Sequence, residues 1–292
     1  MSIVQVRGGL EKVLARVLPP GTLPGDQLGW IYTPRILRDH VQRIAEVLKQ
    51  TKSGVPLEQA LMSFDGTKYS ERVVEYTFTD HWLRENNDTQ SVLDIGCVLN
   101  NKVMTSAVSE SFDSIWYCNP AVEPLCDHGI ETYYAVSTLD NAFRESELKF
   151  GTVTCLSTIE HIGYDNSQYG VHVPDALVEP STEILSESLT KIAGLLYGGG
   201  RALVSVPYGR RNVCHHRITG KKAFQLFDFA SIQEAFESVS SSCVTKLSVF
   251  KATSNGWEKQ QTPEECTPLY GHGVPGAGAV ALIELQKNAD AE

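Results

Sequence analysis

The feature that most constrains the fold of this chain is an alternation of short apolar runs with longer segments, beginning at residue 91. Five of the runs have the length of buried strands: Ser91–Ile95, Ser114–Cys118, Thr132–Val136, Thr152–Leu156 and Ala202–Val206. The intervals between them leave room for crossover helices, which parallel strands require. Such alternation is typical of a doubly wound parallel α/β sheet. We therefore predict a Rossmann-like sheet in a domain of residues 89–292.

The clearest crossover helix is predicted over Ser181–Tyr197. Its apolar residues recur at spacings of four, three and four, which places them on one helix face. They are Leu185, Leu189, Ile192 and Leu196. Three glycines follow at 198–200, and we expect them to end the helix and turn the chain into the strand Ala202–Val206.

The end of the chain departs from this alternation. Val244–Phe250 and Gly278–Leu285 are apolar, strand-like runs, and the loop between them is rich in Gly and Pro and has no helical spacing. Two successive strands without an intervening helix indicate an antiparallel pair at one edge of the sheet.

Residues 1–88 contain no sheet-forming pattern. Apolar residues recur at helical spacing from Pro34 to near Gly54, and an aromatic-rich segment at Glu71–Leu83 is expected to be helical in part. We predict that residues 1–88 form a helical extension or cap on the sheet domain.

Charge and composition narrow the classes of partner. The chain has 25 Lys and Arg against 35 Asp and Glu, a formal charge of -10. Duplex nucleic acid is a poor partner, because phosphate contacts need a basic stripe and none is present. The basic residues gather at 210–222, which could face a phosphorylated acceptor such as a nucleotide sugar or could be a solvated surface loop.

The cysteines and the first residues point to a reducing compartment. The seven cysteines form no CxxC pair, so we expect small buried hydrophobic residues rather than a disulfide or zinc framework. Residues 1–23 carry charges throughout and lack the apolar stretch of a signal peptide. No run is apolar enough for a membrane span. We predict a cytoplasmic protein; its oligomeric state stays open, a homo-oligomer included.

The first strand leads into a tight glycine turn in the run Val92–Cys97. In an open α/β sheet the ligand crevice lies outside the carboxyl ends of the strands, so Asp94 and the turn Gly96–Asn100 should meet a bound cofactor. This run resembles the first motif of the class I S-adenosylmethionine-dependent methyltransferases. Residues Thr152–Gly163 resemble that family's fourth strand and its loop, and Leu195–Leu203 its turn into the fifth strand. Together with the final strand pair, the resemblance covers about residues 90–287.

The resemblance implies S-adenosylmethionine as the methyl donor. Its expected donor-binding residues are Asp94, Gly96, Cys97, Asn119, Thr138 and Ser157. Some positions depart from the family pattern. Val98 stands at the second glycine of the first motif, and Asn119 replaces the acid that grips the ribose. A neutral amide binds a hydroxyl more weakly than a carboxylate, so we expect weakened donor binding.

Glu160 and His161 follow the fourth strand, where an acceptor would approach the methyl group. We predict that His161 is the general base and that Glu160 orients it or contacts the donor's methionine end. Alternatively, the pair only satisfies backbone donors. A metal held by these residues and Cys214–His216 is disfavoured, because Ser157 stands where an acid would be needed and neighbouring histidines point apart.

We therefore predict an O-methyltransferase for a sugar or another small polar metabolite. Val206–Gly209 and Glu71–Tyr76 further resemble a bacterial subgroup associated with polysaccharide and other secondary biosynthesis. The alternative is a methyltransferase-fold protein without transfer activity that acts as a binding or regulatory partner. We also expect Glu71, Arg72, Glu75 or Tyr76 to line the acceptor side and close the crevice, although this segment could instead serve packing or dimerisation.

Overall fold

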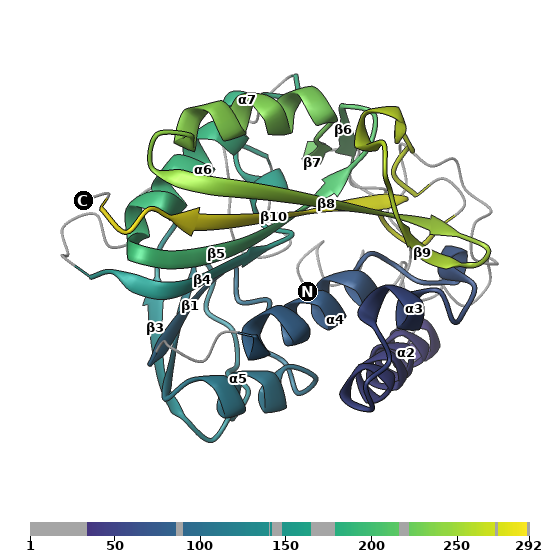
Figure 1. Cartoon of the computed structure of the whole chain (residues 1–292), viewed down its shortest axis with the longest axis horizontal. Coiled ribbons are helices and arrows are strands. Elements are labelled where there is room, and N and C mark those ends of the chain that lie inside the picture. The colour runs from purple at the N-terminus through teal and green to yellow at the C-terminus, as the bar shows by residue number, and fades with distance from the viewer. Residues whose placement is uncertain are drawn as a thin grey trace, which may run out of the picture.

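The computed structural model describes residues 34–85, 90–139, 141, 148–164, 179–215, 222–271 and 274–290. Within these residues one large sheet runs through the centre of the molecule, with helices on both of its faces (Figure 1). Among the helices that the structure describes, none is both long and apolar enough to cross a membrane.

The sheet has eight strands in the order β3-β2-β1-β4-β5-β10-β8-β9. Their bounds are β1 Ser91–Ile95, β2 Ser114–Asn119, β3 Glu131–Val136, β4 Phe150–Leu156, β5 Leu196–Tyr208, β8 Cys243–Thr253, β9 Gly256–Lys259 and β10 Ala279–Lys287. Strands β1 to β5 are parallel, whereas β10 is antiparallel to both β5 and β8. The predicted doubly wound sheet with an antiparallel C-terminal strand pair is therefore confirmed.

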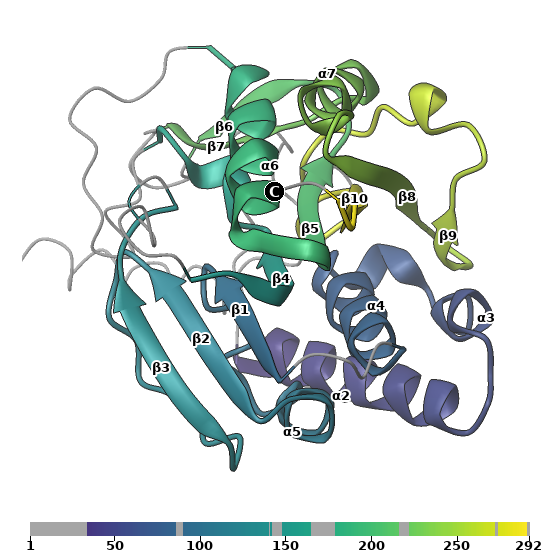
Figure 2. The ribbon, with the colours of Figure 1, turned by 60° about the vertical axis from the view of Figure 1, so that its left-hand side comes forward.

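Two helical layers cover the sheet (Figures 1 and 2). Helices α6 (Glu183–Leu195) and α7 (Phe229–Val239) pack on one face. The other face carries α2 (Pro34–Lys52), α3 (Leu57–Leu61), α4 (Arg72–Arg84) and α5 (Thr105–Ser111). Short 3₁₀ turns occur at η1 (Gly66–Lys68), η2 (Ile159–His161) and η4 (Pro263–Glu265).

The helices before residue 88 share a hydrophobic core with the sheet. Val73 and Leu83 of α4 are fully buried in the same cluster as Val92 of β1 and Leu282 of β10. Because each side chain removed from water contributes about 1.5 to 3 kcal/mol, this shared core holds α4 firmly against the sheet. The helical character of this region is confirmed for residues 34–85, and the domain boundary at residue 88 stays a prediction.

The structure corrects the expected role of the glycines at 198–200. Helix α6 already ends at Leu195, and the glycines lie inside β5, which begins at Leu196. The pairing of β4 with β5 shifts register at this point, between Phe150 and Thr152. Glycine tolerates such an irregularity because it has no Cβ, so here it extends the strand instead of turning the chain.

Three short strands were missed from the sequence. The basic segment is not simply a loop, since β6 (Asn212–His215) and β7 (Lys222–Leu226) form a separate antiparallel pair. Phe224 lies on β7. The short strand β9 extends the sheet beyond β8 within the expected terminal loop. All seven cysteines are free, and all except Cys126 are buried, as predicted.

Candidate functional site

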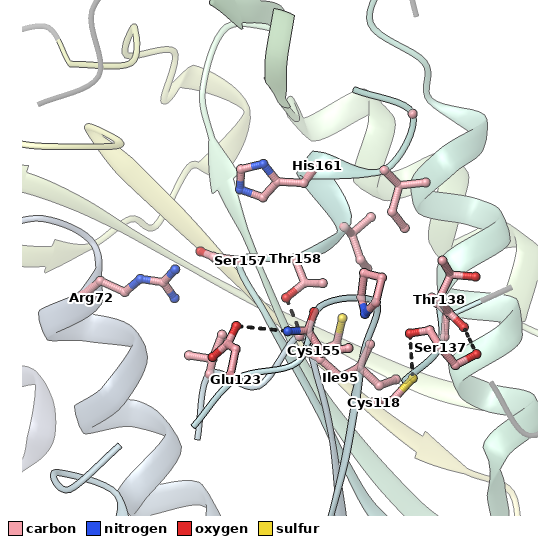
Figure 3. Close-up of a pocket in the computed structure, with 18 residues that line it drawn as sticks. Arg72, Ile95, Cys118, Glu123, Ser137, Thr138, Cys155, Ser157, Thr158 and His161 are labelled. Carbon is pink, nitrogen blue, oxygen red and sulfur yellow. Dashed lines mark hydrogen bonds between the residues drawn. The ribbon is translucent and has the colours of Figure 1, made fainter. Parts of the chain in front are cut away.

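A cavity of about 380 Å³ opens at the carboxyl ends of β1 to β4 (Figure 3). Strands β2 and β3 lie on one side of β1 in the sheet, and β4 and β5 lie on the other side. The strand order therefore reverses at β1, and the cavity lies at this topological switch point. Small-molecule sites of open α/β sheets lie at such points, because the strand-to-helix loops diverge there and leave a crevice. The wall includes Gly96, Asn119, Thr138, Ser157 and His161 of the predicted site residues.

Gly96 makes the turn that forms the floor of the cavity. Its φ is +92°, in the left-handed region that favours glycine, and a Cβ at this position would overlap the Thr158 hydroxyl. The sequence therefore places a glycine where both the backbone conformation and the available space require one.

Asp94 supports this turn from behind the wall instead of lining the cavity. Its buried carboxyl accepts hydrogen bonds from the Leu99 backbone N–H at 2.7 Å and from the Thr154 hydroxyl at 2.8 Å. Burial raises the pKa of Asp94 to about 7. Asp94 fixes the loop of residues 96–100, so its effect on a ligand is indirect.

Cys97 and Val98 lie in the same loop. Cys97 is buried and its thiol contacts the Tyr134 hydroxyl at 3.6 Å, so it also stands outside the wall. Val98 does line the cavity, and the cavity stays open beside it. Asn100 ties this loop to the segment after β2, because its amide donates to the Pro124 carbonyl and accepts from the Cys126 N–H. Val98, which stands at the second glycine position of the first motif, therefore occupies part of the wall without closing the cavity.

Neutral and acidic hydrogen-bonding groups line the cavity in the loops after β2 and β3. Asn119 ends β2, and its amide donates to Oε1 of Glu123 at 3.0 Å. Glu123 lines the cavity together with Ser137 and Thr138 (Figure 3). Glu123 could not be identified from the sequence, because it lies in an irregular loop with no periodicity to orient its side chain. Glu123 therefore places a carboxylate beside Asn119, the residue that replaces the acid of the family pattern.

His161 lies on the wall, on the η2 turn after β4. Its Nδ1 is 3.0 Å from the carbonyl oxygen of Ala223 on β7. A carbonyl can only accept, so Nδ1 carries the proton in this contact, and Nε2 is the nitrogen of a neutral ring that carries the lone pair. The ring also contacts Phe224, with centroids 5.5 Å apart. Strand β7 therefore fixes both the orientation and the tautomer of this imidazole.

Glu160 is buried behind the wall beside His161. Its Oε1 is 4.0 Å from Nε2 of His161, and its Oε2 has no hydrogen-bond partner among the described residues. Burial raises the pKa of Glu160 well above its ordinary value, and the nearby Glu75 raises it further. A protonated Glu160 would limit electrostatic stabilisation of an imidazolium on His161.

Helix α4 reaches the carboxyl ends of β4 and β5 through Glu75. One of its carboxylate oxygens accepts hydrogen bonds from the Ser157 hydroxyl at 2.5 Å and from the Ser205 hydroxyl at 2.6 Å. The other oxygen accepts from Arg72 at 2.9 Å. Ser157 has a φ of +39°, and these bonds hold it in that strained conformation. Arg72 of this segment lines the cavity, and whether it lies on the acceptor side stays a prediction.

Glu71 starts α4 and is buried against the loop before β10. Its carboxyl accepts from the Ala277 N–H at 2.9 Å. Burial, followed by the charge of Glu75, raises the pKa of Glu71 to about 7. Two carboxyls with raised pKa values, Glu71 and Glu160, thus flank the Arg72 and Glu75 ion pair.

Among the described residues, no group of three His, Cys, Asp or Glu side chains is arranged to hold a metal ion. His215 lies on β6, and His216 lies outside the described residues.

Comparison with known proteins finds solved structures of similar fold. No family model matches the chain, and no curated protein matches it. Among solved structures, 1,6-didemethyltoxoflavin-N1-methyltransferase from Burkholderia thailandensis is 14% identical, covering 89% of this chain and 92% of that one, with a TM-score of 0.44.

Two other similar structures come from bacterial methyltransferases. The N-methyltransferase NodS from Bradyrhizobium japonicum, in complex with S-adenosyl-l-homocysteine, is 10% identical over 72% of this chain and 86% of its own, with a TM-score of 0.40. An amino pentose methyltransferase from Micromonospora echinaspora is 11% identical over 74% and 91%, with a TM-score of 0.39.

Proposed function

We propose that this chain is an S-adenosylmethionine-dependent methyltransferase that methylates an oxygen of a small polar acceptor, such as a sugar or a nucleotide sugar. The observation that carries the proposal is the cavity at the switch point, where hydroxyl-binding groups lie at one end and His161 stands on the wall. The resemblance of residues 90–287 to class I methyltransferases supports the same donor.

The groups after β2 and β3 suit the nucleoside of the donor. A ribose offers two neighbouring hydroxyls, and the Asn119 amide and the Glu123 carboxylate are adjacent polar groups that could each bind one. Ser137, Thr138 and Leu139 follow β3 and would border the base. Although Asn119 is neutral, Glu123 supplies an acidic group beside it. This carboxylate favours an active enzyme over the alternative of an inactive binding partner.

When bound, the donor supplies a methyl group on a positively charged sulfur, which leaves as a neutral thioether. The residues of this chain must therefore hold the acceptor in line and remove its proton. We propose that Nε2 of His161 accepts the proton of the acceptor hydroxyl. The imidazolium that forms keeps its Nδ1–H directed at the Ala223 carbonyl, so the ring need not turn during the reaction.

Isothermal titration with S-adenosylhomocysteine and with adenosine triphosphate tests the donor assignment. We expect saturable binding of S-adenosylhomocysteine and none of the triphosphate, whose charge the Glu123 carboxylate beside Asn119 would repel. A bound ligand also raises the free energy of unfolding by RT ln(1 + [L]/Kd), and the melting temperature rises with it. Absence of both binding heat and a melting shift at millimolar S-adenosylhomocysteine would refute the proposed function.

A further inference from the structure

Arg72 stands at the opposite end of the cavity from the groups after β3. Figure 3 shows it at one side of the site, with Ser137 and Thr138 at the other and the end of β4 between them. No other Lys or Arg among the described residues lines the cavity. The site therefore has two chemically different ends, one with the hydroxyls of Ser137 and Thr138 and one with the guanidinium of Arg72.

The guanidinium of Arg72 has hydrogen-bonding capacity to spare. Its Nη1 donates to Glu75, which is its one hydrogen-bond partner among the described residues. One third of the side chain (33%) remains exposed, although α4 itself is packed against the sheet. A guanidinium has five N–H donors arranged to bind a carboxylate through two parallel hydrogen bonds. Arg72 therefore still has donors for an anionic ligand group.

Glu75 fixes where those donors lie. Its Oε1 is held by the hydroxyls of Ser157 and Ser205, so its Oε2 meets Arg72 from a constant direction. Glu75 is fully buried and cannot swing into solvent with its partner. The pairing thus holds the arginine in place before any ligand arrives, which lowers the entropy lost on binding.

We propose that Arg72 binds the carboxylate at the amino-acid end of the methyl donor, with Glu75 as the residue that positions it. The inference rests on the proposed function and sets the direction in which the donor lies. Its nucleoside occupies the end at Asn119 and Thr138, and its amino-acid end runs past Gly96 to α4. Arg72 precedes residues 90–287, over which the class I methyltransferase motifs match, and the resemblance of Glu71–Tyr76 to a bacterial subgroup assigns it no role. The helical extension would then be part of the donor site.

A pair of ligands that differ only in the carboxylate provides the test. S-adenosylhomocysteine is compared with its decarboxylated analogue, which keeps the nucleoside, the sulfur and the amine. Both are titrated against the full-length wild type, Arg72→Met and Arg72→Lys. Arg84→Met is the matched control, because Arg84 lies on the same helix and pairs with Asp80, away from the cavity wall.

For the wild type we expect S-adenosylhomocysteine to bind about 10- to 100-fold more tightly than the decarboxylated analogue, as a charge-assisted contact predicts. Arg72→Met should remove most of this preference by weakening S-adenosylhomocysteine alone, and Arg72→Lys should keep part of it. Arg84→Met should leave the preference intact. Such a difference between ligands measures the contact itself, and a general loss of stability would not reproduce it.

Two results would overturn the inference. If Arg72→Met weakens both ligands equally, the arginine acts on the fold; if it changes neither, Arg72 faces the acceptor or solvent. Should Arg72→Met not fold, the Arg72→Lys preference decides, and a preference equal to that of the wild type together with an unchanged affinity counts against the contact. A wild type that binds neither ligand would instead refute the proposed function.

Discussion

Replacing Glu71 by glutamine tests how the buried carboxyls beside the cavity affect stability. Glutamine retains a carbonyl that can accept the Ala277 N–H but cannot ionise. The pKa of Glu71 is raised from 4.5 to about 7, chiefly by burial. The folded chain thus holds this proton up to a higher pH than the unfolded chain does. The stability that the protonated carboxyl contributes is complete below about pH 4.5 and is lost as the pH rises through about 7.

The size of the effect follows from the displacement of the pKa. Moving a pKa from 4.5 to about 7 corresponds to about 3 kcal/mol of stability lost by the wild type at alkaline pH. Glu71→Gln does not suffer this loss. We expect the variant and the wild type to be about equally stable near about pH 4.5, and the variant to be more stable by up to about 3 kcal/mol at about pH 8.5.

Urea denaturation followed by circular dichroism across this pH range measures the difference. Glu110→Gln is the control, because it removes the same charge from a chain of net charge -10. The hydrogen bond from Arg84 lowers the pKa of the exposed Glu110, so this substitution should slightly destabilise the chain at alkaline pH. A Glu71→Gln variant that is less stable than the wild type at alkaline pH would show that ionised Glu71 stabilises the fold, and would refute the reasoning.

Three further substitutions test the cavity. Gly96→Ala should destabilise the chain by about 2 to 4 kcal/mol and abolish donor binding, because the new Cβ meets Thr158; a stable, binding variant in thermal melts would contradict the observed turn. His161→Ala should lower turnover about 10²- to 10⁴-fold and leave S-adenosylhomocysteine affinity nearly unchanged; equal losses of both would make the histidine structural. Glu123→Gln should weaken S-adenosylhomocysteine about tenfold in titration, and Asn119→Ala less so; the reverse order would assign the ribose to the amide.

The strands that carry the site could be predicted because their pattern is local. Buried parallel strands are apolar on both faces, so β1 and β4 stand out as continuous runs between turns. Gly96 was identified in the same way, because a strand followed by a tight turn requires that residue. The strand β9 and the pair β6 and β7 could not be found so easily, because they are four or five residues long and exist through pairing with a neighbouring strand.

The candidate site residues divide by whether their side chains face the cavity. Asn119, Thr138, Ser157 and His161 end strands or follow them directly, so the strand order places them on the wall. The Asp94 side chain lies behind the cavity wall, where it holds the loop of residues 96–100. Cys97 and Glu160 likewise stand outside the wall. Whether any of these residues contacts the donor stays a prediction.

By itself the sequence determined the fold class, the edge of the sheet at which a ligand can bind and the glycine on which the turn depends, since each follows from contacts between near neighbours in the chain. Only the tertiary structure decided that Glu123 faces the cavity, that the Ala223 carbonyl sets the tautomer of His161, and that Arg72 and Glu75 reach the end of β4. These contacts join residues up to 130 positions apart, as Glu75 and Ser205 are. Their geometry depends on how α4 and β7 pack against the sheet, and no periodicity within one segment records the position of another.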